Sequence, residues 1–157
     1  MERYTLDFNL PVHIFFIGIG GISMSGLAKV LVDRGFHVSG SDNHETELTK
    51  MLEQHGAKVF YGGQKKENIT DDIDVVVYTA AIHPDNPEYV ASVEKKIPMM
   101  TRAELLGELM ENYKSSIAVS GTHGKTTTTS MLSYILMAAN TDPTISLGGM
   151  LAHIGGN

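Results

Sequence analysis

Short apolar runs alternate with amphipathic segments along the first 112 residues of the chain. Residues Val12–Gly18 are rich in β-branched and aromatic side chains, which is typical of a buried parallel strand. Residues Ile22 to Arg34 then carry apolar side chains at helical spacing, and Gly35 ends that helix. Runs of the same two kinds predict further strands over 36–40, 57–62, 74–79 and 97–100, and helices over 46–55, 88–95 and 101–112. The alternation predicts an α/β fold, in which helices flank a parallel sheet.

The pattern begins again after a boundary near residues 111–115. Ser115–Gly121 predicts another buried strand, a glycine-rich loop follows, and the next helix is predicted over 125–139. Residues 144–149 predict the start of one more strand. We therefore predict two units, one over residues 1–112 and the beginning of a second over residues 113–157.

The first glycine loop, GIGGISMSG, lies between a predicted strand and a predicted helix. Gly18 and Gly20 match the first two glycines of the dinucleotide-binding pattern, where they allow a tight turn and close approach to a diphosphate. Ser23 replaces the third glycine. Asp42 follows the second strand, roughly 20 residues on, where an acid can meet a ribose hydroxyl. The alternatives are a turn that binds nothing and, for Asp42, a helix cap or Asx turn.

The second glycine loop, GTHGKTTT, is a shortened form of the phosphate-binding loop that precedes a helix in nucleotide triphosphatases. Gly121 and Gly124 free the backbone to surround a phosphate. Lys125 suits the β- and γ-phosphates of ATP, and the Thr126 hydroxyl suits Mg²⁺. The alternative is a loop of this shape that binds no phosphate.

The composition of the chain limits its expected binding partners and its expected cellular location. The formal net charge is −6, which argues against broad binding to nucleic acid or to anionic membranes. The chain has no cysteine, so a disulfide framework and a thiolate metal site are excluded. We see no signal peptide, and the longest apolar run, Val12 to Gly21, is too short to span a bilayer. The expected location is the cytoplasm, and the oligomeric state is not predicted.

Six motifs occur in the order seen in the Mur ligases, and the chain resembles that family over nearly its whole length. They are GIGGISMSGLA, SGSD, TAAI, NPE, RAELLGELM and GTHGKTTTT. The histidine of the last motif, His123, is similar to two branches of the family, in which histidine stands at this position. One branch joins L-alanine to UDP-N-acetylmuramate, and the other recycles murein peptides. The GIGG loop favours the first branch. Two departures are Ser23, where glycine is common, and Thr79, where a serine pair often precedes Ala-Ile.

The resemblance implies an ATP-dependent, Mg²⁺-dependent ligase of peptidoglycan biosynthesis. In that reaction ATP phosphorylates the lactyl carboxylate of UDP-N-acetylmuramate, and the amine of L-alanine displaces phosphate to form an amide. The resemblance implies catalytic roles for Lys125 and Thr126, with Thr126 holding Mg²⁺. The implied ATP-binding residues are Gly121, Thr122, His123, Gly124, Lys125, Thr126 and Thr127. The implied UDP-substrate-binding residues are Gly18, Gly20, Gly21, Ile22, Ser23, Asp42, Thr79, Ala80, Ala81, Ile82 and Arg102. For Arg102 the alternative is a surface ion pair with Glu104 or Glu108.

The resemblance also implies three domains, of which this chain matches a Rossmann-like first domain and the opening strand and helix of the central ATPase domain. We expect these residues to bind the UDP-sugar without ligase turnover, because after Thr128 the only acidic residue is Asp142. Three other functions stay open. They are an NAD(P)-binding oxidoreductase domain that uses Gly18, Gly20 and Asp42, a murein-tripeptide recycling ligase, and a regulatory nucleotide-binding module without catalysis.

Overall fold

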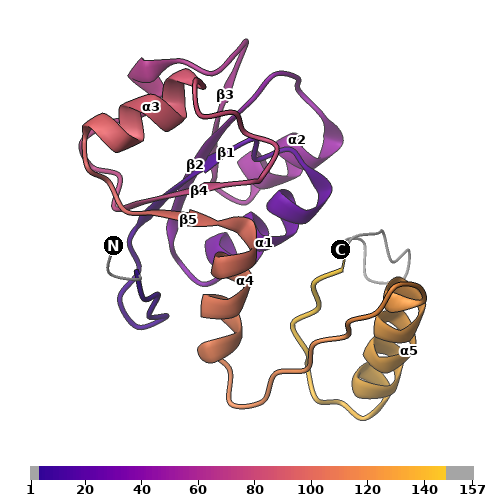
Figure 1. Ribbon diagram of the computed structural model, residues 1–157. Helices are drawn as coiled ribbons and strands as arrows, with labels where there is room; N and C mark the ends of the chain where they lie inside the picture. Colours follow the sequence, from indigo (N-terminus) through magenta and orange to yellow (C-terminus); the bar gives the residue numbers. More distant parts are fainter. Residues whose placement is uncertain (1–3, 148–157) are drawn as a thin grey trace.

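A computed structural model describes residues 4–147 of the chain. Five parallel strands form one sheet in the order β3-β2-β1-β4-β5 (Figure 1). The strands are β1 (His13–Ile17), β2 (His37–Asp42), β3 (Lys58–Tyr61), β4 (Val75–Tyr78) and β5 (Met99–Thr101). The predicted fold class is confirmed. The strand order reverses between β1 and β4, and in such sheets ligands bind at the carboxyl ends of the strands beside that point.

Four of the five helices in residues 4–147, α1 to α4, cover the two faces of this sheet. The helices are α1 (Ile22–Asp33), α2 (Glu47–Gln54), α3 (Pro87–Glu94), α4 (Arg102–Glu111) and α5 (Lys125–Ala138), with a 3₁₀ turn, η1 (Lys66–Asn68). Apolar side chains of α1, α2 and α4 pack on one face, and α3 and the segment after η1 pack on the other. The predicted helices are confirmed to within a residue or two at their ends.

The central strand shows why its sequence is an unbroken apolar run. Ile14 and Phe16 point into the core beneath α1, whereas Phe15 and Ile17 point into the core beneath α3. All four side chains are completely buried. Burying a side chain of this size contributes about 1.5–3 kcal/mol relative to exposure. Because both faces are covered, no polar position interrupts the run, as expected for a parallel sheet.

Side chains of α4 and of its C-cap residue, Asn112, hold the N-terminal segment against the domain. The buried Glu108 carboxylate accepts a hydrogen bond from the Leu6 N–H at 3.1 Å. The Asn112 carbonyl oxygen accepts from the Phe8 N–H at 2.9 Å, and its amide group donates to the Leu6 carbonyl at 2.7 Å. At the other end of α4, Thr101 and Glu104 form the predicted capping box.

The prediction of a buried strand over 115–121 is wrong. That segment forms no strand, and Ile117 is 64% exposed. A strand forms only beside another strand to which its main chain can hydrogen-bond. Within residues 4–147, no strand pairs with the segment 115–121. Residues 144–147 likewise form no strand, and the rest of that predicted strand, 148–149, lies outside the described residues.

The predicted helix after the second loop is confirmed as α5, which Figure 1 shows standing apart from the sheet. Its apolar side chains Met131 and Ile135 are 62% and 65% exposed. Across residues 4–147, none of the helices has the length and apolar character needed to cross a membrane.

Candidate functional site

The first glycine loop turns tightly at the carboxyl end of β1 and is braced by the end of β2. Gly18 has a φ of +81°, a left-handed conformation that favours glycine. The N–H groups of Gly18 and Ile19 both donate to the Ser41 carbonyl at 2.9 Å. The next N–H group, that of Gly20, donates to the Asp42 carboxylate at 2.9 Å. Two residues of β2 therefore fix three consecutive amides of the turn.

Two glycines are required by close approach rather than by backbone conformation. A Cβ at Gly40 would lie 2.6 Å from the Phe16 carbonyl oxygen and 2.8 Å from the Ile19 Cβ. A Cβ at Gly20 would lie 2.7 Å from an Asp42 carboxylate oxygen. The glycine in SGSD thus lets β2 pass directly under the glycine turn, and the second glycine of the loop leaves room for the Asp42 carboxylate.

The N-terminus of α1 carries the features of an anion site. Gly21 is the N-cap residue and supplies no side-chain cap, and the first turn of α1 has no acidic residue. The first N–H groups of a helix have no acceptor in a preceding turn, and the helix dipole adds positive potential there. The Arg102 guanidinium lies at the same place, because it donates to the Ser23 hydroxyl at 3.1 Å. The structure thus brings Arg102 to the loop, and Ile22 beside it is half exposed.

The turn after β4 forms the neighbouring wall of this edge. Because β4 pairs with β1 in parallel, residues Thr79–Ile82 leave the sheet at the same edge as the glycine turn. Thr79 and Ile82 are partly buried, and Ala80 and Ala81 are exposed. The Ile82 N–H donates to the Thr79 carbonyl at 3.0 Å, which closes a tight turn.

The Asp42 side chain forms hydrogen bonds with the main chain of the glycine loop and of its own turn in this structure. Besides accepting from Gly20, its carboxylate accepts from the His44 N–H at 3.3 Å, the geometry of an Asx turn. One of the two alternatives for Asp42 is thus present. Contact between Asp42 and a ribose stays a prediction.

The second glycine loop has the backbone of a phosphate site. Gly124 is the N-cap of α5, with a left-handed φ of 78°. The Lys125 ammonium donates to the carbonyls of Gly121 and Thr122 at 2.7 and 3.4 Å. Residues 121–128, which include His123, Thr126 and Thr127, are exposed to solvent. These residues fit a phosphate group, because a glycine turn, a helix N-terminus and an ammonium group converge there.

No cluster of three or more His, Cys, Asp or Glu side chains suited to a metal ion occurs among the described residues. Thr126 thus stays the predicted Mg²⁺ ligand, and no such cluster accompanies it in residues 4–147. This arrangement suits Mg²⁺, which is commonly held by one or two protein ligands together with phosphate oxygens and water.

Sequence reasoning noted the NPE motif but gave no role to its glutamate. Glu88 is completely buried near the end of β2. Its carboxylate accepts from the Ser41 hydroxyl and the Asn68 amide, both at 2.6 Å. Burial raises the pKa of Glu88, and these hydrogen bonds partly oppose that rise. The signal in the sequence was an acid directly after Asn-Pro, which is a strong helix start.

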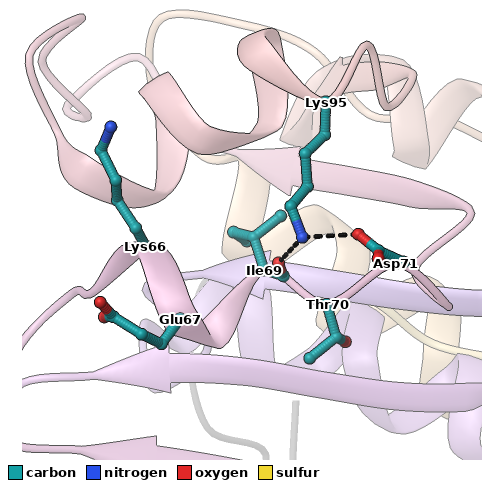
Figure 2. Close-up of a pocket in the computed structure, with 6 residues that line it drawn as sticks. All are labelled: Lys66, Glu67, Ile69, Thr70, Asp71 and Lys95. Carbon is teal, nitrogen blue, oxygen red and sulfur yellow. Dashed lines mark hydrogen bonds and ion pairs between the residues drawn. The ribbon is translucent and has the colours of Figure 1, made fainter.

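A separate open hollow of about 480 Å³ lies between η1 and α3 and is shown in Figure 2. Both of its lysines are engaged. The Lys95 ammonium donates to the Ile69 carbonyl and to Asp71 at 2.6 and 2.7 Å, and Lys66 pairs with Glu94 at 3.2 Å. No sequence motif falls on this hollow, and we assign it no ligand.

Solved structures of two ligases share this fold. UDP-N-acetylmuramate-alanine ligase MurC from Thermotoga maritima matches with a TM-score of 0.84 and 36% identity, over 92% of this chain and 34% of that one. The UDP-N-acetylmuramate:L-alanyl-gamma-D-glutamyl-meso-diaminopimelate ligase from Neisseria meningitides also has a TM-score of 0.84. It is 32% identical, over 94% of this chain and 46% of that one.

Curated relatives are more similar in sequence. A UDP-N-acetylmuramate--L-alanine ligase from Agathobacter rectalis is 64% identical over 98% of this chain. One with the same name from Clostridium kluyveri is 59% identical over 98% of the chain. The chain spans about a third of the length of these relatives. The family model described as "Mur ligase family, catalytic domain" matches residues 13–114, the part that builds the sheet and the first glycine turn. With that match covering more than half of its residues, the chain belongs to the Mur ligase family.

Proposed function

We propose that this chain binds the UDP-sugar substrate of an enzyme that joins L-alanine to UDP-N-acetylmuramate at the expense of ATP, in cytoplasmic peptidoglycan synthesis. The relatives at 59–64% identity carry the name of that activity. The Neisseria ligase, whose name gives a tripeptide as the amine, has the same fold but only 32% identity to this chain. L-alanine is therefore favoured as the amine over a tripeptide.

One observation carries the proposal: the positive N-terminus of α1 and the Arg102 guanidinium meet at Ser23. A diphosphate seated there would accept hydrogen bonds from the first-turn amides, including those of Ile22 and Ser23, and from Arg102. Gly18, Gly20 and Gly21 would contribute by letting the main chain approach the phosphates closely.

The rest of the nucleotide would lie along the carboxyl edge of the sheet. Asp42 at the end of β2 and the turn Thr79–Ile82 after β4 flank the glycine turn on its two sides. We assign them to the ribose and the uracil. In this arrangement Asp42 has two tasks, since its carboxylate also holds the Gly20 amide.

The second glycine loop would hold ATP. Residues Gly121 to Thr127 would surround the phosphates, with Lys125 neutralising charge that develops on the transferred phosphoryl group and Thr126 holding Mg²⁺. Mg²⁺ would supply further neutralisation of the phosphate oxygens. We assign residues 1–112 to the UDP-substrate domain and 113–157 to the start of the ATP-binding domain.

Calorimetry tests the substrate assignment. Titration of the 157-residue chain with UDP-N-acetylmuramate should release heat with one-to-one stoichiometry, and NADH should not. Arg102→Ala should weaken binding about tenfold, the size expected for loss of one charge-assisted hydrogen bond. Lys29→Ala is the matched control, because Lys29 is a cation of α1 that pairs with Asp33. A folded chain that gives no heat with the UDP-sugar, or that prefers NADH, would refute the proposal.

A further inference from the structure

Glu88 stands out because it is a completely buried carboxylate that the proposed reaction does not use. It lies in the first turn of α3, on the face of the sheet opposite α1. Its oxygens accept from the Ser41 hydroxyl, the Asn68 amide and the Lys65 N–H group. Three neutral donors therefore replace the water that burial removes.

The helix start holds this carboxylate in place. The Asn86 side-chain oxygen accepts from the Glu88 and Tyr89 N–H groups at 2.9 and 3.1 Å, and Pro87 occupies the first helical position. The Asn86 amide in turn donates to the Gln64 side chain. Glu88 thus has little freedom to move, so it acts as a fixed acceptor toward β2.

The contact with Ser41 links Glu88 to the glycine turn. The Ser41 hydroxyl donates to Glu88, while the carbonyl of the same residue accepts from both Gly18 and Ile19. Ser41 is itself completely buried, so solvent cannot replace either interaction. We propose that Glu88 is a positioning residue that acts through Ser41 to fix the glycine turn in the shape that receives the diphosphate.

This arrangement joins the two faces of the sheet. The anion site forms on the α1 side, whereas Glu88 and Asn68 belong to α3 and η1 on the other side. Ser41 lies in the strand between them. A change at Glu88 should therefore alter the glycine turn without touching the bound nucleotide.

Amide hydrogen exchange on the 157-residue chain tests the link without any ligand. In Glu88→Gln the side-chain amide would face the Ser41 hydroxyl, so Ser41 must reverse its hydrogen bond and loses its charged acceptor. The amides of Gly18 and Ile19 should then exchange about fivefold to tenfold faster, the size expected when one ordinary hydrogen bond is lost. Ser41→Ala should have the same effect, and the double variant should add little to either.

Ser92→Ala is the matched control. Its hydroxyl is also completely buried in α3 and donates to the Glu88 carbonyl at 2.7 Å, but it lies outside the path to Ser41. It should lower thermal stability without accelerating the Gly18 and Ile19 amides. If it accelerates them as much as Glu88→Gln does, or if neither Glu88→Gln nor Ser41→Ala accelerates them, the proposal is overturned. Should Glu88→Gln fail to fold, Ser41→Ala alone decides the matter.

A second measurement rests on the proposed function. Titration with UDP should show dissociation constants raised about fivefold to tenfold in Glu88→Gln and Ser41→Ala, and unchanged in Ser92→Ala. If UDP fails to bind the wild-type chain, the proposed function falls, while the exchange experiment still decides the role of Glu88. Faster exchange together with unchanged UDP affinity would overturn the proposal as a statement about the nucleotide site.

Discussion

Replacing Gly20 by alanine should break the hydrogen bond between the N–H group of residue 20 and the Asp42 carboxylate. The new Cβ would lie 2.7 Å from the Asp42 carboxylate oxygen and 3.0 Å from the Thr49 methyl group. Gly20 does not have a left-handed φ, so alanine suits its backbone and the cost comes from collision alone. To reach an ordinary contact, the carboxylate must move by several tenths of an ångström and leave the Gly20 amide.

The size of this effect follows from what the movement breaks. The lost hydrogen bond joins the Gly20 N–H to a charged acceptor at 2.9 Å in a half-buried place, so about 1.5 kcal/mol is expected. A cooperative unit of about 100 residues has an unfolding entropy near 0.2 kcal/mol/K, so the melting temperature should fall by about 7 °C. Thermal denaturation followed by circular dichroism measures this change.

A double-mutant cycle shows whether the carboxylate is the cause. In an Asp42→Ala background the alanine methyl at position 20 meets no carboxylate. Gly20→Ala should then lower the melting temperature by about a third of its effect in the wild type, leaving only the contact with Thr49. An equal fall in both backgrounds would refute the reasoning, because it would place the cost elsewhere in the turn.

Three further changes have definite expected outcomes. Gly107→Ala, in the interior of α4 with nothing within 4 Å of its new Cβ, should stabilise the fold by about 0.5–1 kcal/mol, seen as a raised melting temperature. Burial raises the pKa of Glu88, so the folded protein holds the proton of this carboxyl more tightly than the unfolded chain does. The free energy of unfolding of the wild type, measured relative to that of Glu88→Gln, should therefore fall as the pH rises above about 4.5. A rise of this relative free energy with pH would contradict the prediction. Asn112→Ala removes two hydrogen bonds to the N-terminal segment and should cost about 1–3 kcal/mol, with faster exchange at the Phe8 amide; unchanged exchange there would exclude this role of Asn112.

The sheet was predictable because its information is local. The strand β1 is apolar at every buried position, and the glycines after it mark the turn into α1. Predicted ends differ from the observed ones where pairing extends a strand: β2 continues to Asp42, because Ser41 and Asp42 pair with residues of β3. The segment 115–121 also has β-branched residues, Ile117 and Val119, and forms no strand. The residues of a segment indicate whether it can form a strand, but it forms one only where a neighbouring strand is present to pair with it.

The site was predictable in its glycines and only partly in its contacts. The loop sequence identified the residues at the α1 N-terminus, and Arg102 was expected there from resemblance alone. The contact of Arg102 with Ser23 joins residues 79 apart, and the contact of Glu88 with Ser41 joins residues 47 apart. The periodicity of apolar residues along the sequence does not predict such pairs, because they depend on the order of the strands in the sheet. Asp42 shows the same limit, because its bond to Gly20 depends on β2 passing under the turn.

The two glycine loops differ in what holds their shape. Three amides of the first loop are fixed by Ser41 and Asp42 from another strand, so its geometry is set by the sheet before any ligand arrives. In the second loop the contacts come from its own lysine, whose ammonium folds back onto the carbonyls of Gly121 and Thr122. A phosphate would have to draw Lys125 away from those carbonyls, whereas a diphosphate at the first loop would meet the N-terminus of α1 and Arg102 beside a turn whose shape the sheet already sets. A pre-formed site avoids the cost of ordering on binding, so we expect the first loop to bind a phosphate group more tightly than the second, although each has one cationic side chain beside it, Arg102 or Lys125.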